Sequence, residues 1–190
     1  MTEWRGRCPR CSFPRELCLC AEVRPAATRV AITVVRHQAE LSKTSNTARW
    51  AALALPGLTL LDYAATPAPF DASALRLDGA CLLFPAPNET PLPEPLPARL
   101  VLCDGTWQQA RRMLQRIPGL TGLPRLSLPA PGRDTRRLRR PLVAEGMSTL
   151  EALAAALMLF GEPAPAQELL RVNELALSRM VKLRGAHALR

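Results

Sequence analysis

The four residues Asp104-Gly105-Thr106-Trp107 bring side chains that can do chemistry to one turn of the chain. A carboxylate there can accept a proton or bind a cation, and a glycine lets the backbone turn tightly and approach a ligand. A threonine can hydrogen-bond a ligand or cap a helix, and a tryptophan offers a surface for stacking or packing. The spacing alone fits two interpretations, a ligand site or a helix cap followed by a core tryptophan.

A second cluster lies near the amino terminus and consists of two close cysteine pairs. They follow the pattern Cys-x2-Cys-x6-Cys-x-Cys and are Cys8, Cys11, Cys18 and Cys20. Two such pairs can place four thiolates around one tetrahedral ion, and zinc is the usual occupant. A closed four-thiolate site has no open position for water, so we expect a structural role. An iron–sulfur cluster and unrelated buried or redox-active cysteines are the alternatives.

The elements that must position these residues alternate between short apolar runs and helical stretches. Strands are predicted at 29–35, 58–62, 80–84, 99–103 and 125–128, and helices at 47–55, 106–116, 150–160 and 166–183. This alternation predicts an α/β fold, with a mainly parallel sheet and helices on both faces. Cys81 and Cys103 lie inside apolar strands and are expected in the core. We expect a four-cysteine zinc-binding module at 1–25 and a catalytic domain at 26–190.

Ligands of parallel sheets bind beyond the carboxyl ends of the strands. That rule selects the loops after Phe84, Cys103 and Leu128. The 190-residue chain carries a formal charge of +9, and this excess favours a polyanionic partner. No signal peptide and no apolar run of membrane-spanning length is visible, so we expect a cytoplasmic protein that does not associate with membranes.

Several blocks of the sequence, taken in order, resemble the DTW-domain family of tRNA-uridine aminocarboxypropyltransferases, which is named for an Asp-x-Thr-Trp motif. The blocks are the cysteine module, 37–49 with Ser45-Asn46-Thr47, 82–85, 104–114, Arg137-Leu138-Arg139 and 148–152. One departure is Arg136, because the family usually has an aromatic residue just before Arg-Leu-Arg. The resemblance implies a SPOUT-like fold with a C-terminal trefoil knot. It also implies transfer of the 3-amino-3-carboxypropyl group from S-adenosylmethionine to N3 of a tRNA uridine, releasing methylthioadenosine.

The resemblance makes Asp104 the candidate base for the uridine N3 proton, or a group that favours the sulfonium charge of the donor. The expected donor-binding residues lie at the three selected strand ends and on the wall that faces them. They are Leu83, Phe84, Pro85, Asp104, Thr106, Trp107, Leu126, Ser127, Leu128, Ser148 and Thr149. Glu151 stands three positions after Ser148, so we expect it to cap a helix rather than to catalyse.

A phosphate-binding face is expected from basic residues near the predicted site, although charge runs are often only solvated surfaces. The candidates are Arg36, His37, Lys43, Arg49, Arg111, Arg112, Arg133, Arg136, Arg137, Arg139 and Arg140. Among them, a lone histidine after a strand is more often structural. The rival functions are an S-adenosylmethionine-dependent RNA methyltransferase, a non-catalytic zinc-containing RNA-binding module and a redox protein. A monomer and a homodimer both fit the sequence.

Overall fold

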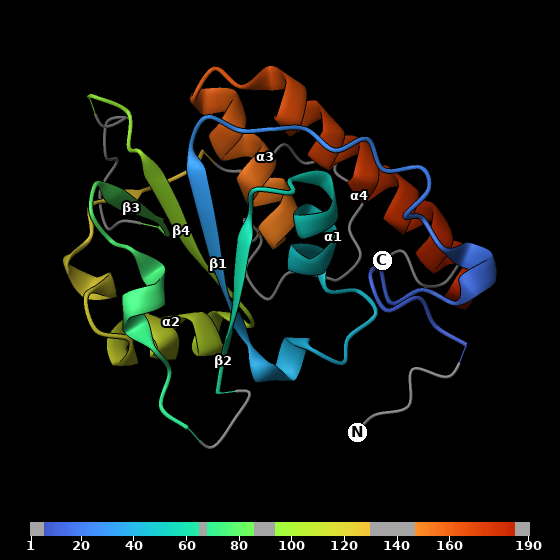
Figure 1. Cartoon of the computed structure of the whole chain (residues 1–190), viewed down its shortest axis with the longest axis horizontal. Coiled ribbons are helices and arrows are strands. Elements are labelled where there is room, and N and C mark those ends of the chain that lie inside the picture. The colour runs from blue at the N-terminus through green and yellow to red at the C-terminus, as the bar shows by residue number, and fades with distance from the viewer. Residues whose placement is uncertain (1–5, 65–67, 86–93, 130–146, 185–190) are drawn as a thin grey trace.

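The fold is an α/β sandwich built on one sheet, and the computed structural model describes residues 6–64, 68–85, 94–129 and 147–184. Five parallel strands pair in the order β2-β1-β4-β3-β5 (Figure 1). Their bounds are β1 Ala31–His37, β2 Thr59–Tyr63, β3 Ala80–Leu83, β4 Arg99–Asp104 and β5 Arg125–Leu126. The predicted parallel sheet is therefore confirmed.

Helices cover both faces of this sheet, as predicted. They are α1 Thr47–Ala54, α2 Trp107–Arg116, α3 Thr149–Leu159 and α4 Pro163–Arg184, with 3-10 turns η1 Arg15–Leu17, η2 Gln38–Glu40, η3 Ala72–Leu75 and η4 Leu120–Gly122. In Figure 1, α1, α3 and α4 lie together on one side of the sheet and α2 lies on the other. None of the helices in the described ranges is both long and apolar enough to cross a membrane.

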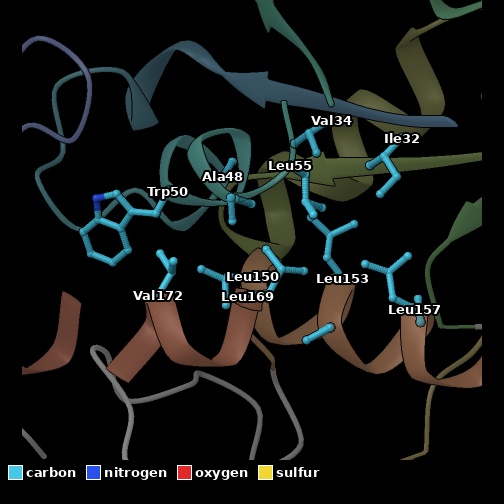
Figure 2. Close-up of a cluster of buried hydrophobic side chains, with 14 of the residues drawn as sticks. Ile32, Val34, Ala48, Trp50, Leu55, Leu150, Leu153, Leu157, Leu169 and Val172 are labelled. Atoms are coloured by element: carbon cyan, nitrogen blue, oxygen red, sulfur yellow. The ribbon is translucent and has the colours of Figure 1, made fainter. Parts of the chain in front are cut away.

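Strands β1 to β4 each send alternate side chains into two separate cores. In β1, Ile32 and Val34 enter the larger core with α1, α3 and α4, whereas Val35 enters the smaller core beside α2. Figure 2 shows Leu150, Leu153 and Leu157 in the larger core. Their spacing is that of one helix face, so α3 packs along its length against the other elements of this core.

Polar caps fix where the helices begin, and three of the four helices start at the carboxyl edge of the sheet. Asn46 caps α1 by accepting a hydrogen bond from the Arg49 amide at 2.9 Å. Thr106 caps α2 and Ser148 caps α3, each in a capping box. The positive ends of three helix dipoles therefore lie at the edge where the sequence places its ligand loops.

The observed elements differ from the predicted ones mainly at their ends. β1 begins at Ala31 because the amides of Arg29 and Val30 donate to the Glu162 carboxylate, at 2.7 and 3.3 Å, instead of to a strand. β5 has two residues, which pair with the last two residues of β3. The trefoil knot stays a prediction, since residues 130–146, between β5 and α3, lie outside the described ranges.

Candidate active site

The carboxylate of Asp104, the last residue of β4, is buried and held from both sides. Asp104 is 7% exposed. Its Oδ1 accepts a hydrogen bond from Thr149 Oγ1 at 2.5 Å, and its Oδ2 accepts one from Asn46 Nδ2 at 2.7 Å. Asn46 is the cap of α1 and Thr149 begins α3, so two helix starts fix the orientation of one carboxylate.

Burial shifts the proton affinity of this carboxyl group. Desolvation raises the pKa of Asp104, the hydrogen bonds from Thr149 and Asn46 oppose that rise, the charge of Glu40 adds to it, and the charge of Arg36 opposes it. The net direction is upward. A buried carboxylate with a raised pKa is a better proton acceptor than an exposed one, and such groups concentrate at functional sites.

A second carboxylate, Asp62, lies two strands away from Asp104 and is paired with a buried arginine between them. Arg36 of β1 stands opposite Asp104 of β4 on one side and Asp62 of β2 on the other. Its Nε and Nη2 both donate to Asp62 Oδ1 at 2.8 Å, and its Nη1 donates to Asn46 Oδ1 at 3.5 Å. One chain of polar contacts therefore runs from Asp62 through Arg36 and Asn46 to Asp104.

The structure of the turn after Asp104 shows which residues of the motif cap the helix and which are available to a ligand. Thr106 is the helix cap, because its Oγ1 accepts from the Gln109 amide at 3.3 Å and its own amide donates to Gln109 Oε1 at 2.8 Å. Asp104 is not a cap, and its carboxylate points to Asn46 and Thr149. At Gly105, a Cβ atom would stand 3.0 Å from Gln109 Oε1 and 3.3 Å from His37 Cβ, so this close turn favours glycine.

Trp107 completes the motif as part of an aromatic wall. It is half-buried, and its ring meets the edge of Phe84 at 5.4 Å between centroids and 82° between planes. The Arg125 guanidinium lies 5.8 Å from the centre of the Phe84 ring. The wall therefore joins the end of β3, the start of α2 and the start of β5 at one edge of the sheet.

The expected donor-binding residues meet at this edge but do not all present side chains there. Leu83 and Leu126 are 8% and 2% exposed and pack into the larger core, and Leu128 packs against that core. For Leu83 and Leu126, a ligand can meet only the backbone. Ser148 accepts from the Glu151 amide and its own amide donates to Glu151 Oε2, which confirms the predicted capping role of Glu151.

Comparison of the sequence with known proteins identifies the family of this chain. The model of the DTW domain matches residues 5–182, nearly the whole chain. The chain belongs to the DTW domain family. The family predicted from the ordered blocks is thereby confirmed, and the Asp104-to-Trp107 turn is its Asp-x-Thr-Trp motif.

Three curated relatives of this DTW domain share the name tRNA-uridine aminocarboxypropyltransferase 2. The domain is 29% identical over 180 residues to the Drosophila melanogaster protein, with 88% of this chain and 72% of that one covered. It is 30% identical over 174 residues to the Mus musculus protein, with 83% and 57% covered, and 25% identical over 168 residues to the Macaca fascicularis protein, with 82% and 56% covered. It thus spans little more than half of the mammalian proteins. No solved structure gives a significant match.

The four amino-terminal cysteines of the DTW domain can hold a metal ion. Their Sγ atoms all lie within 4.8 Å of one another, and the pairs Cys8–Cys20 and Cys11–Cys18 are 3.7 Å apart. Tetrahedral zinc–sulfur bonds of about 2.3 Å place sulfurs about 3.8 Å apart, so the cluster fits the predicted ion. All four are free thiols rather than disulfides.

This cysteine module is packed onto the rest of the domain. Phe13 stacks on Trp50 of α1 at 5.4 Å, and Trp50 Nε1 donates to the Cys11 carbonyl at 3.0 Å. Arg7 donates to Thr44 Oγ1 at 2.7 Å, two residues before Asn46. The module therefore supports the segment that carries one partner of Asp104. The division of domains at residue 25 stays a prediction.

The other two cysteines are core residues, as the sequence predicted. Cys81 packs in the larger core and Cys103 against the smaller one. Burial raises the pKa of Cys81 to about 11 and that of Cys103 to about 12, the nearby charge of Asp104 adding to the second. Both groups therefore stay protonated thiols at neutral pH.

The basic residues expected to contact RNA divide into surface and internal groups. Arg111 and Arg112 are exposed on α2, whereas Arg36 is 7% exposed and paired with Asp62. The loop candidates Arg133, Arg136, Arg137, Arg139 and Arg140 lie outside the described residues.

Three further candidates make local contacts near the end of β1. Lys43 pairs with Glu40 at 2.5 Å, and Arg49 Nη2 donates to the Leu41 carbonyl at 2.5 Å. His37 Nδ1 accepts from the Ala39 amide at 3.1 Å, which is the local structural role that the sequence favoured for a lone histidine. These contacts shape the segment that leads to Asn46.

Two contributors to the site, Asn46 and Asp62, were not among the predicted site residues. In the sequence, Asn46 stands out only as part of the family-like block 37–49, and nothing in that block indicates its contact with Asp104. Asp62 is the last residue of the predicted strand 58–62 and the second-last residue of β2, and this position near a strand end is the signal that could have identified it.

Proposed function

We propose that this DTW domain transfers the 3-amino-3-carboxypropyl group of S-adenosylmethionine to N3 of a tRNA uridine and releases methylthioadenosine. The observation that carries the proposal is Asp104, a buried carboxylate of the family motif whose two oxygens are held by neutral donors. The curated relatives support this substrate class, because they are named tRNA-uridine aminocarboxypropyltransferase 2.

In the proposed step, the uridine N3–H proton passes to the Asp104 carboxylate, and the N3 electron pair attacks the donor's γ-carbon. The bond between that carbon and sulfur breaks, and its electron pair leaves with sulfur as a neutral thioether. A sulfonium is already a good leaving group, so the protein's main task is to position the two substrates. The attacked carbon, and not the donor's methyl group, must face N3.

The donor's adenosine end is assigned to the edge formed by β3, β4 and β5. Phe84 and Trp107 offer aromatic surface there. Leu83 and Leu126 offer backbone groups, since their side chains are buried. Thr149 faces the motif from α3 and already donates to Asp104. The expected positions of Pro85, Ser127, Leu128 and Ser148 around this edge remain part of the proposal.

Binding of tRNA is assigned to the exposed basic residues. Arg111 and Arg112 follow directly on the α2 helix that the motif opens, so phosphates bound there lie close to the site. The loop arginines extend this surface in the proposal. Arg36 is reassigned from RNA contact to the polar network, because burial and its pairing with Asp62 leave it little surface.

Zinc is proposed as the ion of the four-cysteine cluster, held by Cys8, Cys11, Cys18 and Cys20. With all four positions taken by thiolates, its contribution is structural. The contacts of Phe13 with Trp50 and of Arg7 with Thr44 give that structural role a direct route to Asn46.

The proposal is tested by incubating purified protein with S-adenosylmethionine and unmodified tRNA, followed by mass spectrometry of the tRNA nucleosides. Wild-type protein should form aminocarboxypropyl-uridine. Asp104→Asn should form at least about 100-fold less, which is the lower range for loss of a general base. Asp78→Asn, at an exposed position away from the motif, is the matched control and should be fully active.

Two outcomes contradict the proposal. Full activity of Asp104→Asn would remove the carboxylate from the proton transfer. A methylated nucleoside with S-adenosylhomocysteine as co-product would identify an RNA methyltransferase, in which the same donor binds in another pose.

A further inference from the structure

We propose that Asp62 is a positioning residue that holds the Arg36 guanidinium away from Asp104 and so keeps the Asp104 carboxylate free to take a proton. The position of Arg36 between the two carboxylates does not depend on which reaction the protein catalyses. Its consequence for the reaction rate rests on the proposed function.

Three neighbouring strands place one arginine between two carboxylates. Arg36 of β1 has Asp62 of β2 as its neighbour on one side and Asp104 of β4 on the other. Adjacent strands lie about 4.8 Å apart, so one long arginine side chain can reach either carboxylate. The sheet therefore offers one buried cation to two competing carboxylates.

In the structure, the Arg36 guanidinium is paired with Asp62. Both Nε and Nη2 of Arg36 lie 2.8 Å from Asp62 Oδ1, and the remaining nitrogen contact is with Asn46 Oδ1. Asp104 instead receives hydrogen bonds from an amide and a hydroxyl. Within the described part of the chain, no ion pair joins Arg36 to Asp104.

Burial explains why Asp62 is needed for this arrangement. The Arg36 side chain is 9% exposed, and a guanidinium keeps its proton at all ordinary pH values. A buried cation that loses its partner is strongly destabilised, so it turns to another carboxylate within reach. The Asp62 side chain is 36% exposed, and its carboxylate is therefore partly solvated. Without Asp62, the nearest strand neighbour that can compensate Arg36 is Asp104.

The other charged groups near Asp104 have partners of their own, although the charge of Asp62 also acts on Arg49. Glu40 of η2 raises the pKa of Asp104 through its charge and is paired with Lys43. Arg49 of α1 is bound by the carbonyls of Leu41 and Lys43. The contribution of α3 is the neutral Thr149 hydroxyl. Loss of the Asp62 charge would by itself lower the pKa of Asp104 only slightly, so a fall of about one to three units would report that Arg36 has turned to Asp104.

The direct test is the pKa of Asp104 in the full chain without substrates, measured by carbon-13 NMR of aspartate-labelled protein and assigned with Asp104→Asn. In Asp62→Asn, Arg36 should turn to Asp104 and lower that pKa by about one to three units. Asp78→Asn should leave it unchanged. An unchanged or higher pKa in Asp62→Asn would overturn the inference.

The pKa of Asp104 in Arg36→Gln is a second, independent test, which can be made even if Asp62→Asn does not fold. Since Asp62 already holds the cation away, loss of Arg36 should raise the pKa of Asp104 by less than about one unit. A rise of about one to three units would show that Arg36 already pairs with Asp104 in the native protein, which contradicts the inference.

The rate measurement separates this inference from the proposed function. If wild-type protein modifies tRNA, Asp62→Asn should lower kcat and move the acidic limb of its pH profile to lower pH, as expected of a weaker base. A protein without transferase activity whose Asp104 pKa still falls in Asp62→Asn would support the inference and refute the proposed function. An active wild type with an unshifted Asp104 would do the reverse.

Discussion

The hydrogen bond from Thr149 to Asp104 offers the sharpest single perturbation of the site. Thr149→Val replaces the hydroxyl that donates to Asp104 Oδ1 at 2.5 Å by a methyl group of similar volume. Asn46 still donates to the other oxygen. Because the lost bond stabilises only the charged carboxylate, the pKa of Asp104 should rise above its already raised value.

The size of the effect follows from the kind of bond. Hydrogen bonds to charged groups contribute about 1.5–3 kcal/mol. One pH unit corresponds to about 1.4 kcal/mol, so the acidic limb of the pH–rate profile should move upward by about one to two units. The base must be ionised to act, so activity below that limb should fall about tenfold to 100-fold, while the plateau at higher pH is kept or rises, because a carboxylate of higher pKa is a stronger base.

The assay is the initial rate of tRNA modification between pH 5 and 9 under saturating donor, with S-adenosylmethionine and unmodified tRNA. Thr149→Ser is the matched control, because it keeps the hydroxyl and should keep the wild-type profile. A Thr149→Val profile that overlays the wild type, or that moves to lower pH, would refute the assignment of Asp104 as the base.

Three more predictions follow from the same geometry. Asp104→Asn should raise the Tm at pH 7. Folding raises the pKa of Asp104, so the ionised carboxylate destabilises the folded state at pH values above the pKa that Asp104 has in the unfolded chain. The difference in Tm between variant and wild type should therefore vanish as the pH falls below that unfolded-state pKa. An equal or lower Tm at pH 7 would contradict this. Chelation under reducing conditions should release about one zinc per chain, lower the Tm and change Trp50 fluorescence; iron with visible absorbance would indicate a cluster instead. Arg111→Gln with Arg112→Gln should reduce the slope of log tRNA affinity against log salt by about two, one for each phosphate contact, and an unchanged slope would remove α2 from the RNA interface.

Local sequence patterns predicted most of the fold because each element carries its own signals. The three capping sequences mark the starts of α1, α2 and α3, and the apolar runs mark all five strands. Strand ends were less accurate, since the start of β1 is set by Glu162, which lies about 130 residues further along the chain. Contacts so distant in sequence cannot be read from a local pattern.

The location of the candidate site was predicted from the sequence, but the contacts between its polar residues were not. The motif and the carboxyl-end rule located Asp104, Phe84 and Trp107 at one edge of the sheet. They could not show that Arg36 lies between two carboxylates, because that depends on the strand order β2-β1-β4. Nor could they show that the Leu83 side chain turns into the core, since strands buried on both faces have no polar alternation to reveal direction.

The central claim is that one chain moves an aminocarboxypropyl group from a sulfonium donor to a uridine. The most direct test is to quantify both products of a single wild-type reaction by mass spectrometry. The account predicts equal amounts of methylthioadenosine and N3-modified uridine in tRNA, appearing at the same rate. Methylthioadenosine without modified uridine, or S-adenosylhomocysteine with a methylated base, would contradict it.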